Sequence, residues 1–192
     1  MAKKNASWND DFYTKKARND DFKARSAFKL QEIDAKYRLF QPGQSVLDLG
    51  CAPGSWLQYV LRRIGGSGSA TGIDLQETVV AGAICIQADI YQYSYENMKP
   101  VDAVISDMAP STSGQPFVDA QRSLELCERA FEIASVLLKK NGFFICKIFQ
   151  GEDLDSFFKS LKPHFKAVHR FKPESSRDKS RELFIIGTGF QQ

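Results

Sequence analysis

The sequence predicts a single α/β domain built on a mostly parallel, seven-stranded sheet with helices on both faces. Short apolar segments alternate with helical ones along the chain. Most of the apolar segments are hydrophobic almost throughout, as are strands buried on both faces of a sheet. The length of 192 residues suits one domain. Hydrophobic residues at 43% and charged residues at 26% are near the globular average, which excludes a wholly disordered chain.

The N-terminal part is expected to form a flexible basic arm over residues 1–21, ahead of one folded domain over residues 22–192. An amphipathic helix is predicted from Phe22 to Phe40, because large apolar residues recur near helical spacing there. The Pro42-Gly43 pair that follows would end this helix.

Seven strands and three more helices are predicted after that point, from β-branched and apolar runs on one side and helical periodicity on the other. The strands are expected at Ser45–Leu49, Ala70–Asp74, Ala83–Gln87, Val101–Ser106, Phe143–Ile148, Ala167–Phe171 and Leu183–Thr188. The helices are expected at Gly54–Ile64, Gln115–Lys140 and Asp153–Leu161. A polar segment, Lys172–Glu182, joins the last two strands.

The formal net charge of +3 hides a segregation of charge along the chain. Residues 1–41 carry ten Lys/Arg and six Asp/Glu, residues 42–158 carry eight and fourteen, and residues 159–192 carry eight and three. An acidic centre between two basic ends indicates a site for a cationic or hydroxyl-rich ligand, flanked by surfaces that attract polyanions. The alternative is that these charge runs are solvated faces with no ligand, as such runs usually are.

The cysteines and the hydropathy indicate the cellular compartment in which the protein is expected. The four cysteines form no CxxC pair, which argues against a zinc site and for reduced thiols in a cytosolic compartment. No apolar run reaches the roughly 18–20 residues of a membrane span. The lysines near the N-terminus are not followed by the apolar stretch of a secretory signal. We therefore expect a cytoplasmic protein with no metal and no membrane partner.

The stretch Val46–Trp56 is the first that carries chemistry. A strand runs into a glycine-bearing turn and then a helix, which is how doubly wound folds place a nucleotide at the strand ends. Gly50 and Gly54 would let a ligand approach the backbone closely. Ala52 and Ser55 occupy the second and third glycine positions of the dinucleotide fingerprint, so a pyrophosphate cradle is disfavoured.

Aspartates lie at the ends of three successive predicted strands: Asp74, Asp89 and Asp107. Any one of them is more often a turn or capping residue than a ligand. Together, at one edge of a parallel sheet, they favour a nucleoside pocket in which Asp74 accepts the ribose hydroxyls. Acidic groups without a phosphate-binding loop favour a cationic nucleoside over NAD, and S-adenosylmethionine fits that description.

These motifs make the chain similar to the FtsJ/RrmJ (RlmE-type) ribose 2′-O-methyltransferase family over residues 22–190. The matching segments are Ala24–Leu30, Leu47–Trp56, Ser106–Pro110, Ile145–Lys147 and Ser180–Glu182. The family is recognised by a Lys–Asp–Lys–Glu tetrad, whose members fall at Lys29, Asp107, Lys147 and Glu182. The family's turn more often reads Pro-Gly-Gly-Trp, so Ser55 is a departure from the pattern.

The resemblance implies a Rossmann-like domain that uses S-adenosylmethionine, and it implies a role for each tetrad residue. Lys147 would be the general base, assisted by Lys29 as a second cation, because a free lysine is protonated at neutral pH. Asp107 would orient Lys147 and contact the cofactor, and Glu182 would help to position the ribose. Cofactor binding is expected at Gly50, Ala52, Pro53, Gly54, Trp56, Asp74, Asp89 and Asp107.

Several of these side chains also have an ordinary structural interpretation. A lysine at a strand end, such as Lys147, usually extends its amine to solvent. Glu182 could pair with a neighbouring surface cation, a contact worth about 0–1 kcal/mol. Trp56 could simply fill the core. Only the joint occurrence of the tetrad favours catalytic roles.

The implied substrate is RNA, most specifically a uridine of large-subunit ribosomal RNA within a 50S or pre-50S particle, with the enzyme acting as a monomer. tRNA anticodon loops and mRNA caps are the alternative substrates, and a non-catalytic RNA-binding assembly factor is the alternative class. Base methylation is disfavoured, because the fourth strand ends in Asp-Met-Ala-Pro. Phosphate contacts are expected from the basic ends, at Lys15, Lys16, Arg18, Lys23, Arg25, Lys172, Arg177, Lys179 and Arg181.

Overall fold

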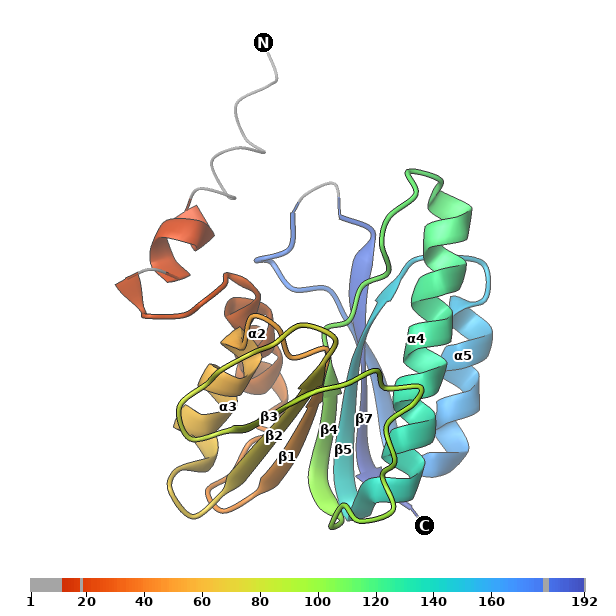
Figure 1. Cartoon of the computed structure of the whole chain (residues 1–192). Coiled ribbons are helices and arrows are strands. Elements are labelled where there is room, and N and C mark those ends of the chain that lie inside the picture. The colour runs from red at the N-terminus through yellow and green to blue at the C-terminus, as the bar shows by residue number, and fades with distance from the viewer. Residues whose placement is uncertain (1–11, 18, 178–179, 192) are drawn as a thin grey trace.

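A computed structural model describes residues 12–17, 19–177 and 180–191. Its seven-stranded sheet has the order β3-β2-β1-β4-β5-β7-β6, and β7 runs antiparallel to both of its neighbours (Figure 1). The strands are β1 Ser45–Leu49, β2 Ser69–Asp74, β3 Ile84–Gln87, β4 Val101–Ser106, β5 Leu138–Phe149, β6 Phe165–Phe171 and β7 Glu182–Phe190. The helices are α2 Ser26–Tyr37, α3 Ser55–Ile64, α4 Pro116–Leu137 and α5 Leu154–Leu161, followed by the 3₁₀ helix η1 Lys162–His164. The predicted mostly parallel, seven-stranded α/β architecture is confirmed.

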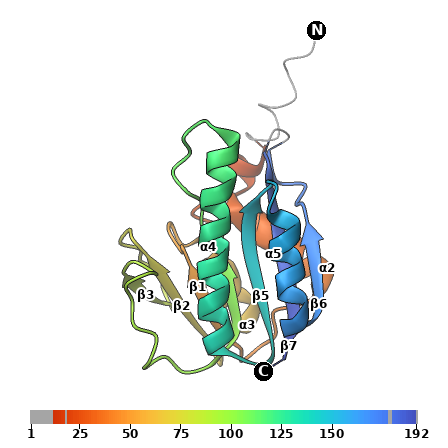
Figure 2. The ribbon, with the colours of Figure 1, turned by 90° about the vertical axis from the view of Figure 1, so that its right-hand side faces the viewer.

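The helices cover both faces of the sheet. α2 and α3 lie against one face and α4 and α5 against the other, as Figures 1 and 2 show from two directions. Each face has its own buried apolar cluster: Leu30, Leu57 and Phe184 belong to the α2/α3 side, and Leu124 and Phe157 to the α4/α5 side. Within the described part of the chain, no helix combines the length and the apolar character that a membrane crossing needs.

The first predicted helix is shorter than expected. It was predicted from Phe22 to Phe40, but α2 spans Ser26–Tyr37. The helix ends because Arg38 adopts a left-handed conformation, with φ 53°. The buried carboxylate of Asp34 then accepts hydrogen bonds from the backbone N–H groups of the next two residues, at 2.9 and 3.1 Å. These contacts satisfy backbone donors that would otherwise continue the helix.

The boundary between α4 and β5 also differs from the prediction. The helix was expected to reach Lys140, but it ends at Leu137, and β5 starts at Leu138. Leu138 is paired with Val101 of β4, so the sheet extends into sequence whose composition suits a helix. Tertiary pairing therefore outweighs local propensity at this boundary.

The N-terminal segment is partly ordered against the domain. Residues 12–17 are helical, Ala17 is buried, and the rings of Tyr13 and Phe28 lie 5.6 Å apart. Residues 1–11 and Arg18 lie outside the described residues, so the flexible arm over 1–21 stays a prediction. The same holds for the phosphate contact predicted at Lys179.

One end of the sheet collects the segments that bear the predicted site. The parallel strands β1, β2, β3 and β4 end there, and so does β5. The N-terminal segment, the loop before α4 and the loop between β6 and β7 all gather at this end (Figure 1). The fold therefore brings both basic ends of the sequence to the edge where the aspartates lie.

Candidate active site

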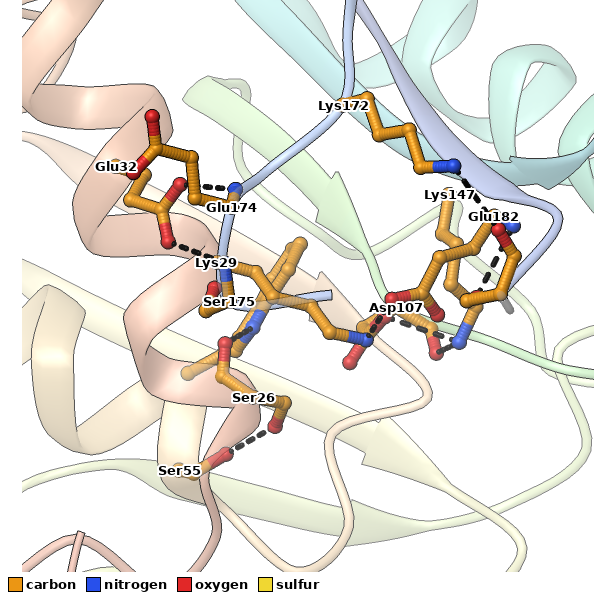
Figure 3. A network of polar contacts seen from close by, with 12 residues as sticks. Ser26, Lys29, Glu32, Ser55, Asp107, Lys147, Lys172, Glu174, Ser175 and Glu182 are labelled. Atoms are coloured by element: carbon orange, nitrogen blue, oxygen red, sulfur yellow. Dashed lines mark hydrogen bonds and ion pairs between the residues drawn. The ribbon is translucent and has the colours of Figure 1, made fainter. Parts of the chain in front are cut away.

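Lys147 and Asp107 form one half of a polar network at the end of β5 and β4. The Lys147 ammonium lies 3.0 Å from Asp107 Oδ1 and also donates a hydrogen bond to the Asp107 carbonyl (Figure 3). The Lys147 side chain is 7% exposed, so it does not extend to solvent as strand-end lysines usually do. Burial and two oxygen partners hold its amine at a defined position.

Lys29 and Glu182 form the other half of the network. Lys29 Nζ lies 2.6 Å from Glu182 Oε1, and both side chains are about one-tenth exposed. Burial by itself would raise the pKa of Glu182, but the charge and the hydrogen bond of Lys29, with smaller contributions from Ser176 and Lys147, lower it overall. Glu182 is therefore an anion held beside the amine, rather than half of an exposed surface pair.

The two halves meet because α2 and β7 cover the end of β5. In the antiparallel register, Lys147 lies opposite Phe184 and Phe149 lies opposite Glu182. Lys147 and Glu182 are thus diagonal neighbours on one face of the sheet. Figure 3 shows Lys29 reaching from α2 toward the same point. The structure brings all four tetrad residues together.

Trp56 and Ser55 anchor the helix that carries Lys29. The Trp56 indole donates to the Ser26 carbonyl at 2.9 Å, and the Ser55 and Ser26 hydroxyls lie 2.7 Å apart. Trp56 is 2% exposed, and its ring lies 5.8 Å from that of Phe184. The serine that departs from the family's usual turn thus contacts the first residue of α2.

A second anchor holds the loop between β6 and β7 against α2. The Glu32 carboxylate accepts hydrogen bonds from the backbone N–H groups of Glu174 and Ser175, at 2.6 and 2.9 Å. At the start of the same loop, the Lys172 amine donates to the Ser180 carbonyl. The loop ends at Glu182, the first residue of β7. Glu32 therefore ties the loop before Glu182 to the helix that carries Lys29.

A cavity of about 410 Å³ opens beside this network. The predicted cofactor residues Gly50, Ala52, Asp74, Asp89 and Asp107 all line it. Its volume lies within the range of roughly 300–1,000 Å³ typical of small-molecule and cofactor sites. Asp107 belongs to the cavity wall and also pairs with Lys147.

The acidic wall of the cavity is held by backbone hydrogen bonds. Asp74 accepts from the N–H groups of Ala52 and Gln76, at 2.9 and 2.8 Å. Asp89 accepts from the N–H of Tyr91 at 2.9 Å. The Asp74 contact also ties the end of β2 to the glycine turn after β1. These carboxylates are thereby fixed in the cavity wall.

Three predicted cofactor residues lie elsewhere. Pro53, Gly54 and Trp56 do not contribute to the cavity wall as the described residues form it. Gly54 has φ +105°, and a Cβ at this position would lie 2.3 Å from the Val80 side chain. The glycine is thus required by the turn and by close packing against Val80. Trp56 instead donates its indole N–H to Ser26 of α2.

The profile of the FtsJ-like methyltransferase family matches residues 22–190 of the chain. The chain belongs to the FtsJ-like methyltransferase family. The resemblance inferred from the tetrad motifs is thereby confirmed.

Two bacterial relatives of this FtsJ-like methyltransferase are similar over almost their full length. The "Ribosomal RNA large subunit methyltransferase E" of Desulfatibacillum aliphaticivorans is 46% identical, with 92% of this chain and 89% of the relative covered. The protein of the same name from Bdellovibrio bacteriovorus is 44% identical, with 92% and 95% covered. Among solved structures, a ribosomal RNA methyltransferase of Plasmodium falciparum superposes with a TM-score of 0.80 at 28% identity, covering 88% of this chain and 98% of that one.

The structure of this FtsJ-like methyltransferase adds cavity residues that the sequence did not single out. Tyr91, Met108 and Leu126 line the cavity together with the predicted aspartates. Met108 lies inside the segment Ser106–Pro110, in which only Asp107 was assigned a role. Tyr91 lies two residues after Asp89, so extending that motif by two positions would have found it. Leu126 lies within α4, and its sequence neighbourhood contains no such signal.

Asp48 is a further acidic residue that sequence analysis passed over. It is 1% exposed, and neither carboxylate oxygen has a hydrogen-bond partner among the described residues. Burial, with smaller contributions from Asp107 and Asp74, raises its pKa well above the usual 3.8. Asp48 therefore favours its neutral, protonated form inside the domain.

The charge state of Asp48 predicts a pH-dependent stability. Because its folded-state pKa is raised, its contribution to stability is present at low pH and is lost as pH rises above about 4 toward the folded-state pKa. We expect Asp48→Asn to raise the free energy of unfolding at pH 7 by about 1–3 kcal/mol, with a flatter pH profile. Urea unfolding between pH 4 and pH 8 measures both quantities.

Asp102 provides a control of opposite sign. Burial raises its pKa, but the Ser45 N–H and the Lys139 amine outweigh burial and lower it, so its ionised form stabilises the fold. Asp102→Asn should therefore lower the free energy of unfolding at pH 7. If Asp48→Asn also lowers it and keeps the wild-type pH profile, Asp48 is not a buried neutral acid.

Proposed function

We propose that this FtsJ-like methyltransferase transfers a methyl group from S-adenosylmethionine to the 2′-oxygen of a ribose in large-subunit ribosomal RNA. The observation that carries the proposal is the position of Asp107, which lies in the wall of the acidic cavity and beside Lys147. One residue thus joins a candidate cofactor pocket to a candidate base. The names of the relatives supply the class of RNA.

The cavity suits a cationic nucleoside. Asp74, Asp89 and Asp107 put three carboxylates into one wall, with the apolar side chains of Met108 and Leu126 completing it. Carboxylates favour hydroxyl and ammonium groups over phosphates, because phosphates would be repelled. Asp74 and Asp89 would hold the nucleoside end and Asp107 the end nearest Lys147. When bound, S-adenosylmethionine supplies a methyl group on a positively charged sulfur.

Lys147 is suited to take the proton of the 2′-hydroxyl. Its amine is buried and is held by Asp107, so it presents a lone pair in a fixed direction whenever it is neutral. Lys29, held by Glu182, places a second cation beside the site and can bind the phosphate of the target nucleotide. Most of the rate enhancement would come from aligning the ribose oxygen with the methyl group.

The substrate in this proposal is a uridine of the large-subunit RNA in a 50S or pre-50S particle. The target ribose must be exposed, because an RNA duplex does not present its nucleotides to a buried site. RNA binding would depend on contacts between its phosphates and exposed cations such as Lys172 and Arg181 near Glu182. We propose that the enzyme acts as a monomer in the cytoplasm, where large-subunit RNA is modified.

A methylation assay tests this proposal. Purified protein is incubated with S-adenosylmethionine labelled in its methyl group and with 50S subunits from cells that lack the enzyme. Ribose methylation blocks alkaline cleavage at the modified nucleotide, so the product can be mapped by its resistance to hydrolysis. Label in a base, or no incorporation into 50S subunits or free RNA, would contradict the proposal.

A single substitution separates cofactor binding from the chemical step. Asp89→Ala should weaken S-adenosylmethionine binding by about tenfold, because a hydrogen-bonding carboxylate contributes roughly 1–3 kcal/mol. Turnover at saturating cofactor should change little. Calorimetry measures the affinity. Glu96→Ala is the control, because Glu96 is an exposed acid in the same loop between β3 and β4. Equal affinities in both variants would exclude Asp89 from the cofactor site.

A further inference from the structure

A second and larger hollow lies on the far side of β7 from the catalytic network. It has a volume of about 740 Å³ and is lined by the C-terminal end of α2, by α5 and η1, and by β6. Figure 2 shows β6 at the edge of the sheet with α5 on one side and α2 behind it. We call this hollow the β6 groove; the residues that define it are Lys36, Tyr37, Phe158, Lys162, His169 and Arg170. Among the described residues, none lines both this groove and the acidic cavity.

The β6 groove is strongly basic. Lys36, Lys159, Lys162 and Arg170 are exposed around it, and the single carboxylate of its wall, Asp155, is paired with Arg170 at 2.6 Å. This is the opposite of the acidic cavity, although both belong to one domain. An open surface with several cations and one neutralised acid attracts a polyanion.

The groove also presents aromatic rings between its cations. The Arg170 guanidinium lies 4.2 Å and the Lys162 amine 5.4 Å from the centre of the Phe158 ring. On the other face of β6, the rings of Tyr37 and His169 lie 5.0 Å apart with an interplanar angle of 30°. Aromatic faces alternating with cations are what single-stranded RNA requires, since its bases stack and its phosphates pair.

The groove is connected to the catalytic network through α2. Lys36 follows Lys29 by seven residues, two turns of the helix, so the two lysines share a face about 10 Å apart along the axis. The Lys36 amine lies 5.0 Å from the Phe171 ring at the end of β6. The next residue is Lys172, whose amine donates to the carbonyl of Ser180, two residues before Glu182 (Figure 3). Cations thus continue from the groove to the site.

Protection of the sheet edge explains only part of this arrangement. β6 ends the sheet, and charged side chains on an edge strand prevent pairing with other chains. That role would require cations on β6 alone. The lysines of α2, α5 and η1 and the rings of Tyr37 and Phe158 converge on the same hollow without protecting an edge.

We propose that the β6 groove binds a single-stranded segment of the substrate RNA that flanks the target nucleotide. Lys36, Lys159 and Lys162 contact its phosphates, and Phe158 and Tyr37 stack with its bases. This proposal rests on the proposed function, because it assigns to the groove a part of the same RNA. The groove would raise affinity and orient the RNA without taking part in the chemical step.

Removal of two groove cations tests the proposal. The double variant Lys36→Ala, Lys162→Ala is compared with Lys99→Ala, Lys140→Ala, which removes two exposed lysines near the amino-terminal ends of β4 and β5. Binding is measured with a labelled 20-nucleotide single-stranded RNA at several salt concentrations, and methylation with 50S subunits from cells that lack the enzyme. We expect the groove variant to bind RNA about tenfold more weakly, with a salt slope reduced by about 1.4, and to keep its kcat within twofold. The control should match the wild type.

A second variant tests the stacking part. Phe158→Leu keeps the apolar volume and removes the aromatic face, so RNA affinity should fall several-fold while the salt slope stays unchanged. If both groove variants bind the RNA oligonucleotide like the control, the groove does not hold RNA. If they bind the oligonucleotide normally and only their KM for 50S subunits rises, the groove contacts a part of the particle other than single-stranded RNA, and the proposal is wrong. Absence of methylation by the wild type would instead contradict the proposed function, whatever the groove binds.

Discussion

Lys147→Ala should abolish methyl transfer, with a loss of at least about 10³-fold in kcat. The variant lacks the amine that would take the proton of the 2′-hydroxyl, and no other lysine among the described residues is paired with Asp107. Affinity for S-adenosylmethionine should stay within a few-fold, because the aspartates and the glycine turn that form the cavity are unchanged. Single-turnover assays and calorimetry measure the two quantities separately.

Lys140→Ala is the matched control for this experiment. Lys140 lies on the same strand but at its other end, where it is exposed. Its removal should leave both turnover and cofactor affinity unchanged. Turnover within threefold of wild type in Lys147→Ala would exclude Lys147 as the base. A collapse of cofactor affinity would assign it to the pocket instead.

Asp107→Asn should reduce kcat by about 10²-fold or more and weaken cofactor binding by about tenfold. Both effects are expected, because Asp107 lies in the cavity wall and is also the anion beside Lys147. The amide keeps the size of the side chain and the backbone carbonyl that accepts from Lys147, so only the charge is removed. This double loss distinguishes Asp107 from Asp89, which should affect affinity alone.

The control for Asp107→Asn lies on the same strand. Asp102→Asn removes a carboxylate at the start of β4, at the opposite end of the strand from the cavity. There Asp102 contacts Lys139 and Ser45. It is expected to change stability but neither kcat nor cofactor affinity. If Asp107→Asn loses only affinity, or only kcat, the carboxylate does not join the two sites.

Much of the fold could be predicted from local patterns. β1 and β4 have the predicted ends, and the other five strands overlap their predictions, because apolar β-branched runs between turns are strong local signals. The predicted extents of the first helix and of the helix before β5 were wrong. Asp34 and the pairing of Leu138 with Val101 decide those ends through contacts that the local pattern does not contain.

In the candidate site, too, local motifs could be predicted from the sequence and long-range contacts could not. The tetrad could be identified because its members lie within short motifs, and the aspartates because each lies at the end of a strand. The position of Trp56 could not be predicted, because its partner Ser26 is 30 residues away on another helix. The anchoring of the loop before Glu182 depends on Glu32 and Ser175, which are 143 residues apart.

The sequence by itself determined the order of the elements, the glycine turn and the residue types of the site, since these depend on neighbours along the chain. Only the tertiary structure decided which of these residues meet. It pairs Lys29 with Glu182, isolates Asp48 in the interior and joins cations of α2, η1 and β6 in one groove. Such contacts depend on strand order and on the face that each side chain occupies, and both follow from the packing of the whole domain.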